Sequence, residues 1–123
     1  MSKHDPKVTL AQIEEFVVEV GSYLENETLE SLLADRIRCR AFERVMSCIG
    51  EAVKRLPMPL REAYPEVDWK GAAGLRDWVT HGYDGLDYPV LWKASHEQLP
   101  ELLETVRRMR ADLDQTTPGP STN

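Results

Sequence analysis

The side chains with the clearest chemical potential stand close together between residues 76 and 83. Arg76 offers a planar fork of donors that suits phosphate oxygens, and His81 can exchange a proton near neutral pH. If a helix runs to about residue 81, Asp77 and His81 stack at i and i+4 with Arg76 alongside. A glycine follows His81 and suits the end of a helix, so Tyr83 can fold back toward the imidazole. This set is suited to phosphoryl chemistry without a metal.

The same residues also have a purely structural interpretation. A histidine followed by glycine is typical of an ordinary helix C-terminus, because the helix dipole favours a cation there and glycine ends the helix. Short motifs match by chance often, so the rest of the chain must separate the two interpretations.

Other kinds of site find little support. His4, His81 and His96 have no metal-ligand spacing among them, and Cys39 and Cys48 stand in a region that is predicted to form one helix. Nine helical residues span about 13 Å along the axis, too far for a disulfide. No glycine-rich phosphate loop follows a strand, and no serine stands in a nucleophile elbow. We therefore expect neither a metal nor a cofactor.

The composition is that of a soluble globular protein, with 41% hydrophobic and 29% charged residues among 123. We expect one domain over residues 1–115 and a disordered tail over 116–123, which is rich in Thr, Pro, Gly and Ser. The polar start and the absence of any run of 18 apolar residues predict a cytoplasmic protein without a membrane segment.

The net charge of −6 is unevenly distributed. Residues 1–35 carry two basic and eight acidic side chains, whereas the chain from Arg36 onward carries 13 of each sign. An anion is thus expected to dock around Arg76 rather than on the first helix. The basic residues that could assist it there are Arg40, Arg44, Lys54 and Arg55.

The spacing of apolar residues predicts helices and no strands. Helices are expected over about 9–24, where Thr9 to Gln12 resembles a capping box, and over 28–33, 36–56, 69–81 and 88–98, with a last helix from Pro100. Residues 57–65 are interpreted as a connector with at most one helical turn. The fold class is therefore an all-α, antiparallel bundle of about five helices.

The helix over 36–56 carries the most regular pattern. Its core stripe is Phe42, Val45, Ile49, Ala52 and Leu56, widened by Ile37, Ala41 and Cys48. Gly50 in the middle costs up to about 1 kcal/mol relative to alanine, which indicates close packing of another backbone there. Glu51 is adjacent, and we consider Glu51 and Arg44 as residues that could support the site.

The residues around Arg76 also carry a family resemblance. The order Arg76, Asp77, three residues, His81, one residue and Tyr83 resembles the motif of the HepT branch of the HEPN superfamily. The stretches 49–56 (IGEAVKRL) and 69–76 (WKGAAGLR) are also similar to that family, and the likeness extends over residues 8–113. Asp77 departs from the asparagine that is more frequent in HepT proteins. A carboxylate there would raise the pKa of His81 and favour its acid form.

The resemblance implies a helical homodimer whose motifs face each other across a two-fold axis, and a metal-independent endoribonuclease that acts as a bacterial toxin. In this role Arg76 would hold the scissile phosphate, His81 would transfer protons, Asp77 would orient His81, and Tyr83 would position RNA.

The resemblance further implies a partner, an MntA-like nucleotidyltransferase that neutralises the toxin by attaching AMP to Tyr83. Two alternatives stay open. The chain could be a non-catalytic, nucleotide-binding helical partner subunit of a nucleotidyltransferase, or a plain helical dimerisation module.

Overall fold

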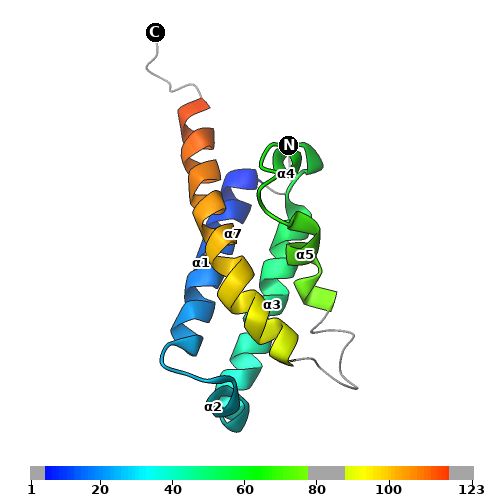
Figure 1. Ribbon diagram of the computed structural model, residues 1–123. Coiled ribbons are helices and arrows are strands. Elements are labelled where there is room, and N and C mark those ends of the chain that lie inside the picture. The colour runs from blue at the N-terminus through cyan, green and yellow to red at the C-terminus, as the bar shows by residue number, and fades with distance from the viewer. Residues whose placement is uncertain (1–4, 78–87, 117–123) are drawn as a thin grey trace.

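The computed structural model describes residues 5–77 and 88–116, and the elements in these ranges are helices throughout (Figure 1). They are α1 (Pro6–Leu24), α2 (Leu29–Ala34), α3 (Arg36–Arg55), α4 (Met58–Glu62), α5 (Trp69–Ala73) and α7 (Tyr88–Thr116). Residues 75–77 add a further helical turn after Gly74. The prediction of an all-α fold is confirmed. Residues 117–123 of the predicted tail lie outside the described residues.

Three long helices, α1, α3 and α7, form the body of the bundle. Helix α1 runs in the opposite direction to α3 and α7, and α5 packs against α3 (Figure 1). Short helices lie at opposite ends, α2 where α1 turns into α3 and α4 where α3 ends (Figure 1). The core between the long helices is apolar, with fully buried Leu10, Ile13, Phe42, Ile49 and Val106. In the described part of the chain, no helix is long and apolar enough to span a membrane.

The predicted core stripe of α3 is confirmed. Phe42, Val45, Ile49, Ala52 and Leu56 are all buried. The expected widening at Ile37 is wrong, because this side chain is 84% exposed. Ile37 lies in the first turn of α3, at the end of the bundle beside α2, so the core does not reach it.

The start of α1 differs from the prediction. The helix begins at Pro6 and not at Thr9, and Asp5 caps it by accepting a hydrogen bond from the Lys7 backbone N–H at 2.9 Å. Proline suits a first helical position because its missing N–H would have no helical partner there. Thr9 is instead a buried residue inside the helix.

Helix α7 is continuous where two helices were predicted. Pro100 lies inside it, although proline removes a backbone hydrogen bond and usually ends or kinks a helix. Leu91 and Leu99 before the proline and Leu102 and Val106 after it are all buried, so packing against the core stabilises the helix on both sides. The helix also extends through Thr116, one residue into the predicted tail.

Candidate functional site

Arg76 stands on the helical turn that follows α5, and local interactions anchor this segment. Asp68 caps α5 by accepting from the Gly71 N–H at 3.0 Å, as predicted, and the Trp69 indole N–H donates to the Tyr64 carbonyl at 2.8 Å. Trp69, Ala72 and Leu75 are buried. These three residues form the buried face of the segment. Arg76 and Asp77 lie outside this face, and their side chains are partly exposed.

The predicted helix over 69–81 is interrupted at Gly74, where the chain passes very close to α3. A Cβ added to Gly50 would lie 2.6 Å from the Arg76 backbone nitrogen and 2.9 Å from the Ala73 carbonyl oxygen. The prediction that Gly50 admits another backbone is therefore confirmed. The backbone that it admits is the one that carries Arg76.

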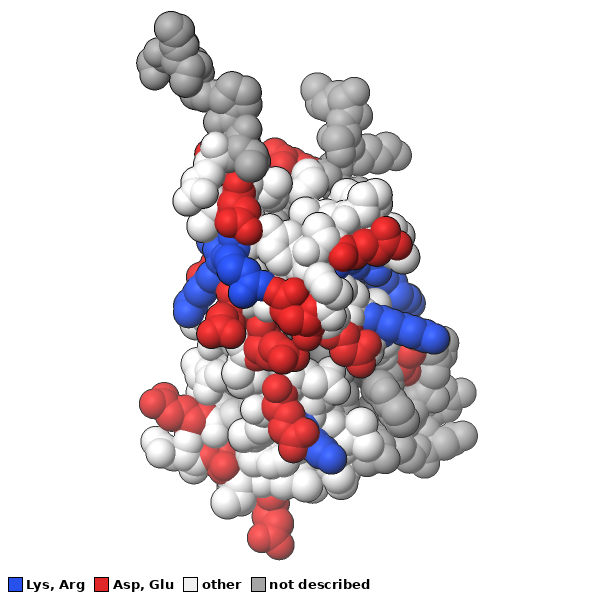
Figure 2. Space-filling model, turned by 45° about the horizontal axis from the view of Figure 1, so that its top comes forward, with Lys and Arg blue, Asp and Glu red and all other residues white. Residues whose placement is uncertain are grey.

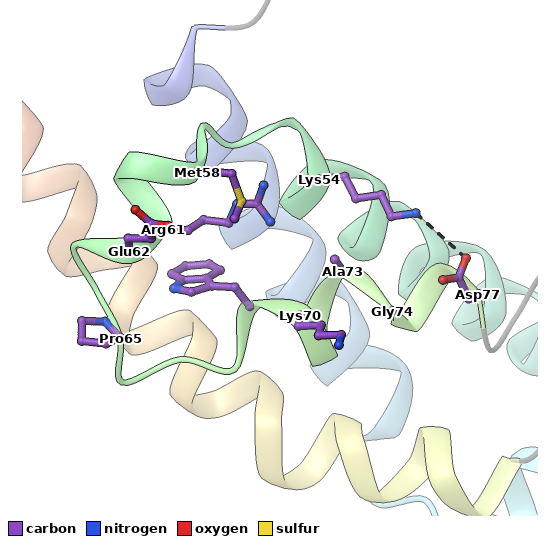
Figure 3. Close-up of a pocket in the computed structure, with 10 residues that line it drawn as sticks. Lys54, Met58, Arg61, Glu62, Pro65, Lys70, Ala73, Gly74 and Asp77 are labelled. Carbon is purple, nitrogen blue, oxygen red and sulfur yellow. Dashed lines mark ion pairs between the residues drawn. The ribbon is translucent and has the colours of Figure 1, made fainter.

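Charged side chains connect this segment to α3. The Arg76 Nε forms an ion pair with the Glu51 carboxylate. The Asp77 carboxylate lies 4.0 Å from the Arg76 Nη1. It also lies 4.0 Å from the Lys54 Nζ, as the dashed line in Figure 3 marks. Glu51, proposed only as a supporting residue, is thus a direct partner of Arg76.

On one side of Arg76 is a polar hollow of about 470 Å³, here called the cationic hollow. Three arginines line it, Arg44, Arg55 and Arg76, together with one acidic residue, Glu51. The remaining lining residues are Phe16, Ser47 and Cys48. An excess of positive charge in a partly enclosed space attracts an anion.

The basic residues considered from the sequence are thus divided. Arg44 and Arg55 lie in the cationic hollow, and the Arg55 Nη2 also donates to the Gln12 side chain at 3.1 Å. Lys54 pairs instead with Asp77, and Arg40 pairs with Glu43 at 3.4 Å.

Charges are also unevenly distributed over the surface of the molecule. On the face in Figure 2, acidic side chains gather across the middle with basic ones on either flank, so the net charge does not describe every part of the surface.

A second cavity of about 610 Å³ opens on the other side, between the end of α3, α4 and α5 (Figure 3). We call it the apolar pocket. Its apolar lining is Met58, Pro65, Trp69, Ala73 and Gly74, and its charged lining is Lys54, Arg61, Glu62, Lys70 and Asp77. The sequence predicts a connector with at most one helical turn over residues 57–65, and α4 is that turn. It does not predict the pocket, because the other wall of the pocket comes from α5 and the turn after it.

His81 and Tyr83 lie outside the described residues, and so does the rest of the motif after Asp77. Their roles remain predictions. Within residues 5–77 and 88–116, no cluster of His, Cys, Asp and Glu is placed to hold a metal ion. His96 is exposed and its ring lies 4.4 Å from that of Trp92, and both cysteines are free thiols.

The known proteins that this chain resembles are named as ribonucleases. The family model described as "Ribonuclease HepT-like" matches residues 13–109. A protein of Methanocaldococcus jannaschii named "Putative RNase" is 32% identical over 114 residues, which cover 93% of this chain and 94% of the relative. No solved structure matches the chain significantly.

Two further relatives come from other organisms. A "Putative RNase" of Caldanaerobacter subterraneus is 37% identical over 77% of this chain and 82% of its own length. A "Probable ribonuclease HepT" of Thermococcus cleftensis is 32% identical over 88% of this chain and 98% of its own length.

Proposed function

Because this chain belongs to the HepT-like ribonuclease family, we propose that it is a metal-independent endoribonuclease that cuts RNA by attack of a 2′-hydroxyl on the adjacent phosphate. The observation that carries the proposal is the position of Arg76. It forms an ion pair with Glu51 of α3 and borders a hollow that is lined by two further arginines.

In this mechanism Arg76 binds the scissile phosphate. Glu51 occupies its Nε, and a guanidinium has five N–H donors, so donors remain for phosphate oxygens. Positive charge at the phosphate stabilises the crowded, more negative transition state. Arg44 and Arg55 would bind neighbouring phosphates of the same strand.

The reaction also requires two proton transfers. The 2′-oxygen loses its proton to a base as it bonds to phosphorus, and the 5′-oxygen gains a proton from an acid as its bond to phosphorus breaks. The products are a 2′,3′-cyclic phosphate and a 5′-hydroxyl. We assign these transfers to His81, oriented by Asp77, and the placement of RNA to Tyr83.

A homodimer follows from this assignment, because one chain supplies one motif imidazole whereas base and acid require two. We further propose that the protein is a cytoplasmic toxin, silenced when an MntA-like nucleotidyltransferase attaches AMP to Tyr83. Phosphate attached there would place negative charge beside Arg76 and compete with the RNA phosphate.

Cleavage of RNA by the purified protein in EDTA tests the proposal. The wild type is expected to cut and to leave 2′,3′-cyclic phosphate ends. Arg76→Ala should reduce cleavage by about 100-fold or more, since one lost donor to a transition-state oxyanion has an effect of this order. Arg36→Ala is the matched control, because it removes the same charge from the exposed first turn of α3.

Intact mass and dimer mass are measured on the same samples. An AMP adduct on Tyr83 in an inert wild type would support the silenced toxin. An unmodified wild type that binds nucleotides but does not cut would contradict the ribonuclease and favour the nucleotide-binding partner subunit. If Arg76→Ala cuts as fast as the wild type, the assignment of Arg76 is wrong.

A further inference from the structure

The mechanism above makes no use of the apolar pocket, although its composition is unusual for a surface. Met58 lies there with 56% of its surface exposed. Trp69, Ala73 and Gly74 complete the apolar lining on the α5 side. The volume of about 610 Å³ falls within the range of roughly 300–1,000 Å³ that is typical of small-molecule sites. A ligand group that fits must therefore be compact and largely apolar on its faces.

The charges around this pocket indicate the rest of the ligand. Three basic side chains line it, Lys54, Arg61 and Lys70, against the two carboxylates of Glu62 and Asp77 (Figure 3). Arg61 is held in place because its Nε donates to the Leu56 carbonyl at 3.1 Å. An apolar surface bordered by cations is the combination that binds bases and phosphates of single-stranded nucleic acids.

The apolar pocket and the cationic hollow lie on either side of two consecutive residues. Arg76 lines the cationic hollow and Asp77 lines the apolar pocket. Two consecutive residues at the end of α3 are divided in the same way, since Lys54 lines the apolar pocket and Arg55 lines the cationic hollow. A strand whose phosphate is bound by Arg76 therefore has an apolar site within reach of a neighbouring base.

We propose that the apolar pocket holds the unpaired base of a nucleotide that flanks the scissile phosphate. This inference rests on the proposed function and specifies its substrate as RNA that is single-stranded at the cut. A base can enter the pocket only when it is unstacked from a duplex, so paired RNA would be a poor substrate.

Met58→Glu tests the pocket, because it places a carboxylate on the apolar lining at an exposed position. Leu33→Glu is the matched control: it adds the same charge at a 46% exposed leucine on α2, at the opposite end of the bundle (Figure 1). Met58→Glu should raise the KM for single-stranded RNA by about tenfold with little change in kcat, which is the order of effect of losing one stacked base. Leu33→Glu should leave both unchanged.

RNA that lacks one base beside the cut makes the test specific. With the base absent at the position that the pocket serves, the wild type should lose about the same tenfold. Met58→Glu should then lose nothing further, because the base that it excludes is already absent. Additive losses would overturn the proposal.

Binding is measured separately from cleavage through the Trp69 indole N–H, whose NMR signal is assigned with Trp69→Phe. Nucleoside 5′-monophosphates should shift this signal in the wild type and not in Met58→Glu. Ribose 5-phosphate, which has the phosphate and no base, should not shift it. An equal shift by ribose 5-phosphate would overturn the proposal.

The two readouts distinguish the failure of this inference from that of the proposed function. If RNA is cut and Met58→Glu cuts it as well as the wild type, the base site is wrong and the ribonuclease stands. If no RNA is cut but nucleotides shift the Trp69 signal, the pocket still binds a base, whereas the ribonuclease and the placement of this base beside a scissile phosphate both fail. If Met58→Glu instead changes the number of chains in the particle, measured as its mass in solution, the pocket is an interface with a second copy and the proposal is wrong.

Discussion

Arg76 and Glu51 form an ion pair that contributes little to folding. Their side chains are 37% and 45% exposed, and exposed ion pairs stabilise proteins by about 0–1 kcal/mol. Arg44 is also exposed, so its position in the same hollow gives no clear gain in the free energy of unfolding. The arrangement is better explained by binding of an anion, which needs several cations around one space.

Arg44→Ala should weaken the binding of single-stranded RNA without unfolding the protein. Each phosphate contact contributes about −0.7 to the slope of log K against log salt concentration, so the slope should become shallower by about that amount. Binding is measured at salt concentrations from roughly 50 to 300 mM, because affinity that depends on phosphate contacts changes strongly over this range. Arg36→Ala serves as the control, and an unchanged slope in Arg44→Ala would remove Arg44 from the site.

Helix α3 positions the site through its glycine as much as through its charged residues. Gly50 is buried, and its missing Cβ allows the segment from Ala73 to Arg76 to pass directly over the helix. Gly21 in α1 provides a contrast, because a Cβ added there would meet nothing within 4 Å. The same residue type thus serves a tertiary contact in α3 and only weakens the helix in α1.

Gly50→Ala should destabilise the protein by about 1–3 kcal/mol, because the new Cβ must displace backbone atoms of Ala73 and Arg76. Cleavage should fall as well, since Arg76 moves. Gly21→Ala should instead stabilise it by about 0.5–1 kcal/mol through higher helix propensity and leave cleavage intact. Urea unfolding of both variants provides the measurement. If Gly50→Ala and Gly21→Ala have the same free energy of unfolding, the contact at Gly50 is not tight.

The bundle as a whole is joined between its first and last helices by Glu14. Its carboxylate accepts hydrogen bonds from the Arg107 Nε at 2.7 Å and the Arg110 Nη1 at 2.5 Å. These bonds to Arg107 and Arg110 lower the pKa of Glu14 from its ordinary value of 4.5. The contribution to stability is therefore present above pH 4.5 and is lost as the pH falls through the lower pKa of the folded state.

Glu14→Gln should accordingly reduce the free energy of unfolding by about 1 kcal/mol at pH 7. The difference from the wild type should shrink as the pH falls below 4.5, because the wild-type carboxylate also loses its charge. Glu15→Gln, at an exposed position next to it on α1, is the control and should show no comparable difference at pH 7. A difference for Glu14→Gln that stays constant down to pH 3, roughly 1.5 units below the ordinary glutamate pKa, would contradict this account.

The sequence by itself determined the helical class, the buried stripe of α3, the Asp68 cap and the close approach at Gly50. These features depend on the periodicity of apolar residues and on short-range cap chemistry, which the local sequence contains. The roles of His81 and Tyr83 rest on the family motif and remain predictions.

Only the tertiary structure decided the features that depend on distant residues. The continuity of α7 through Pro100 depends on the core that covers both of its halves, and the exposure of Ile37 depends on where that core ends. The pairing of Glu51 with Arg76 joins residues 25 positions apart, a spacing that no helical repeat predicts. The apolar pocket likewise brings Met58 together with Ala73, because α5 folds back along α3.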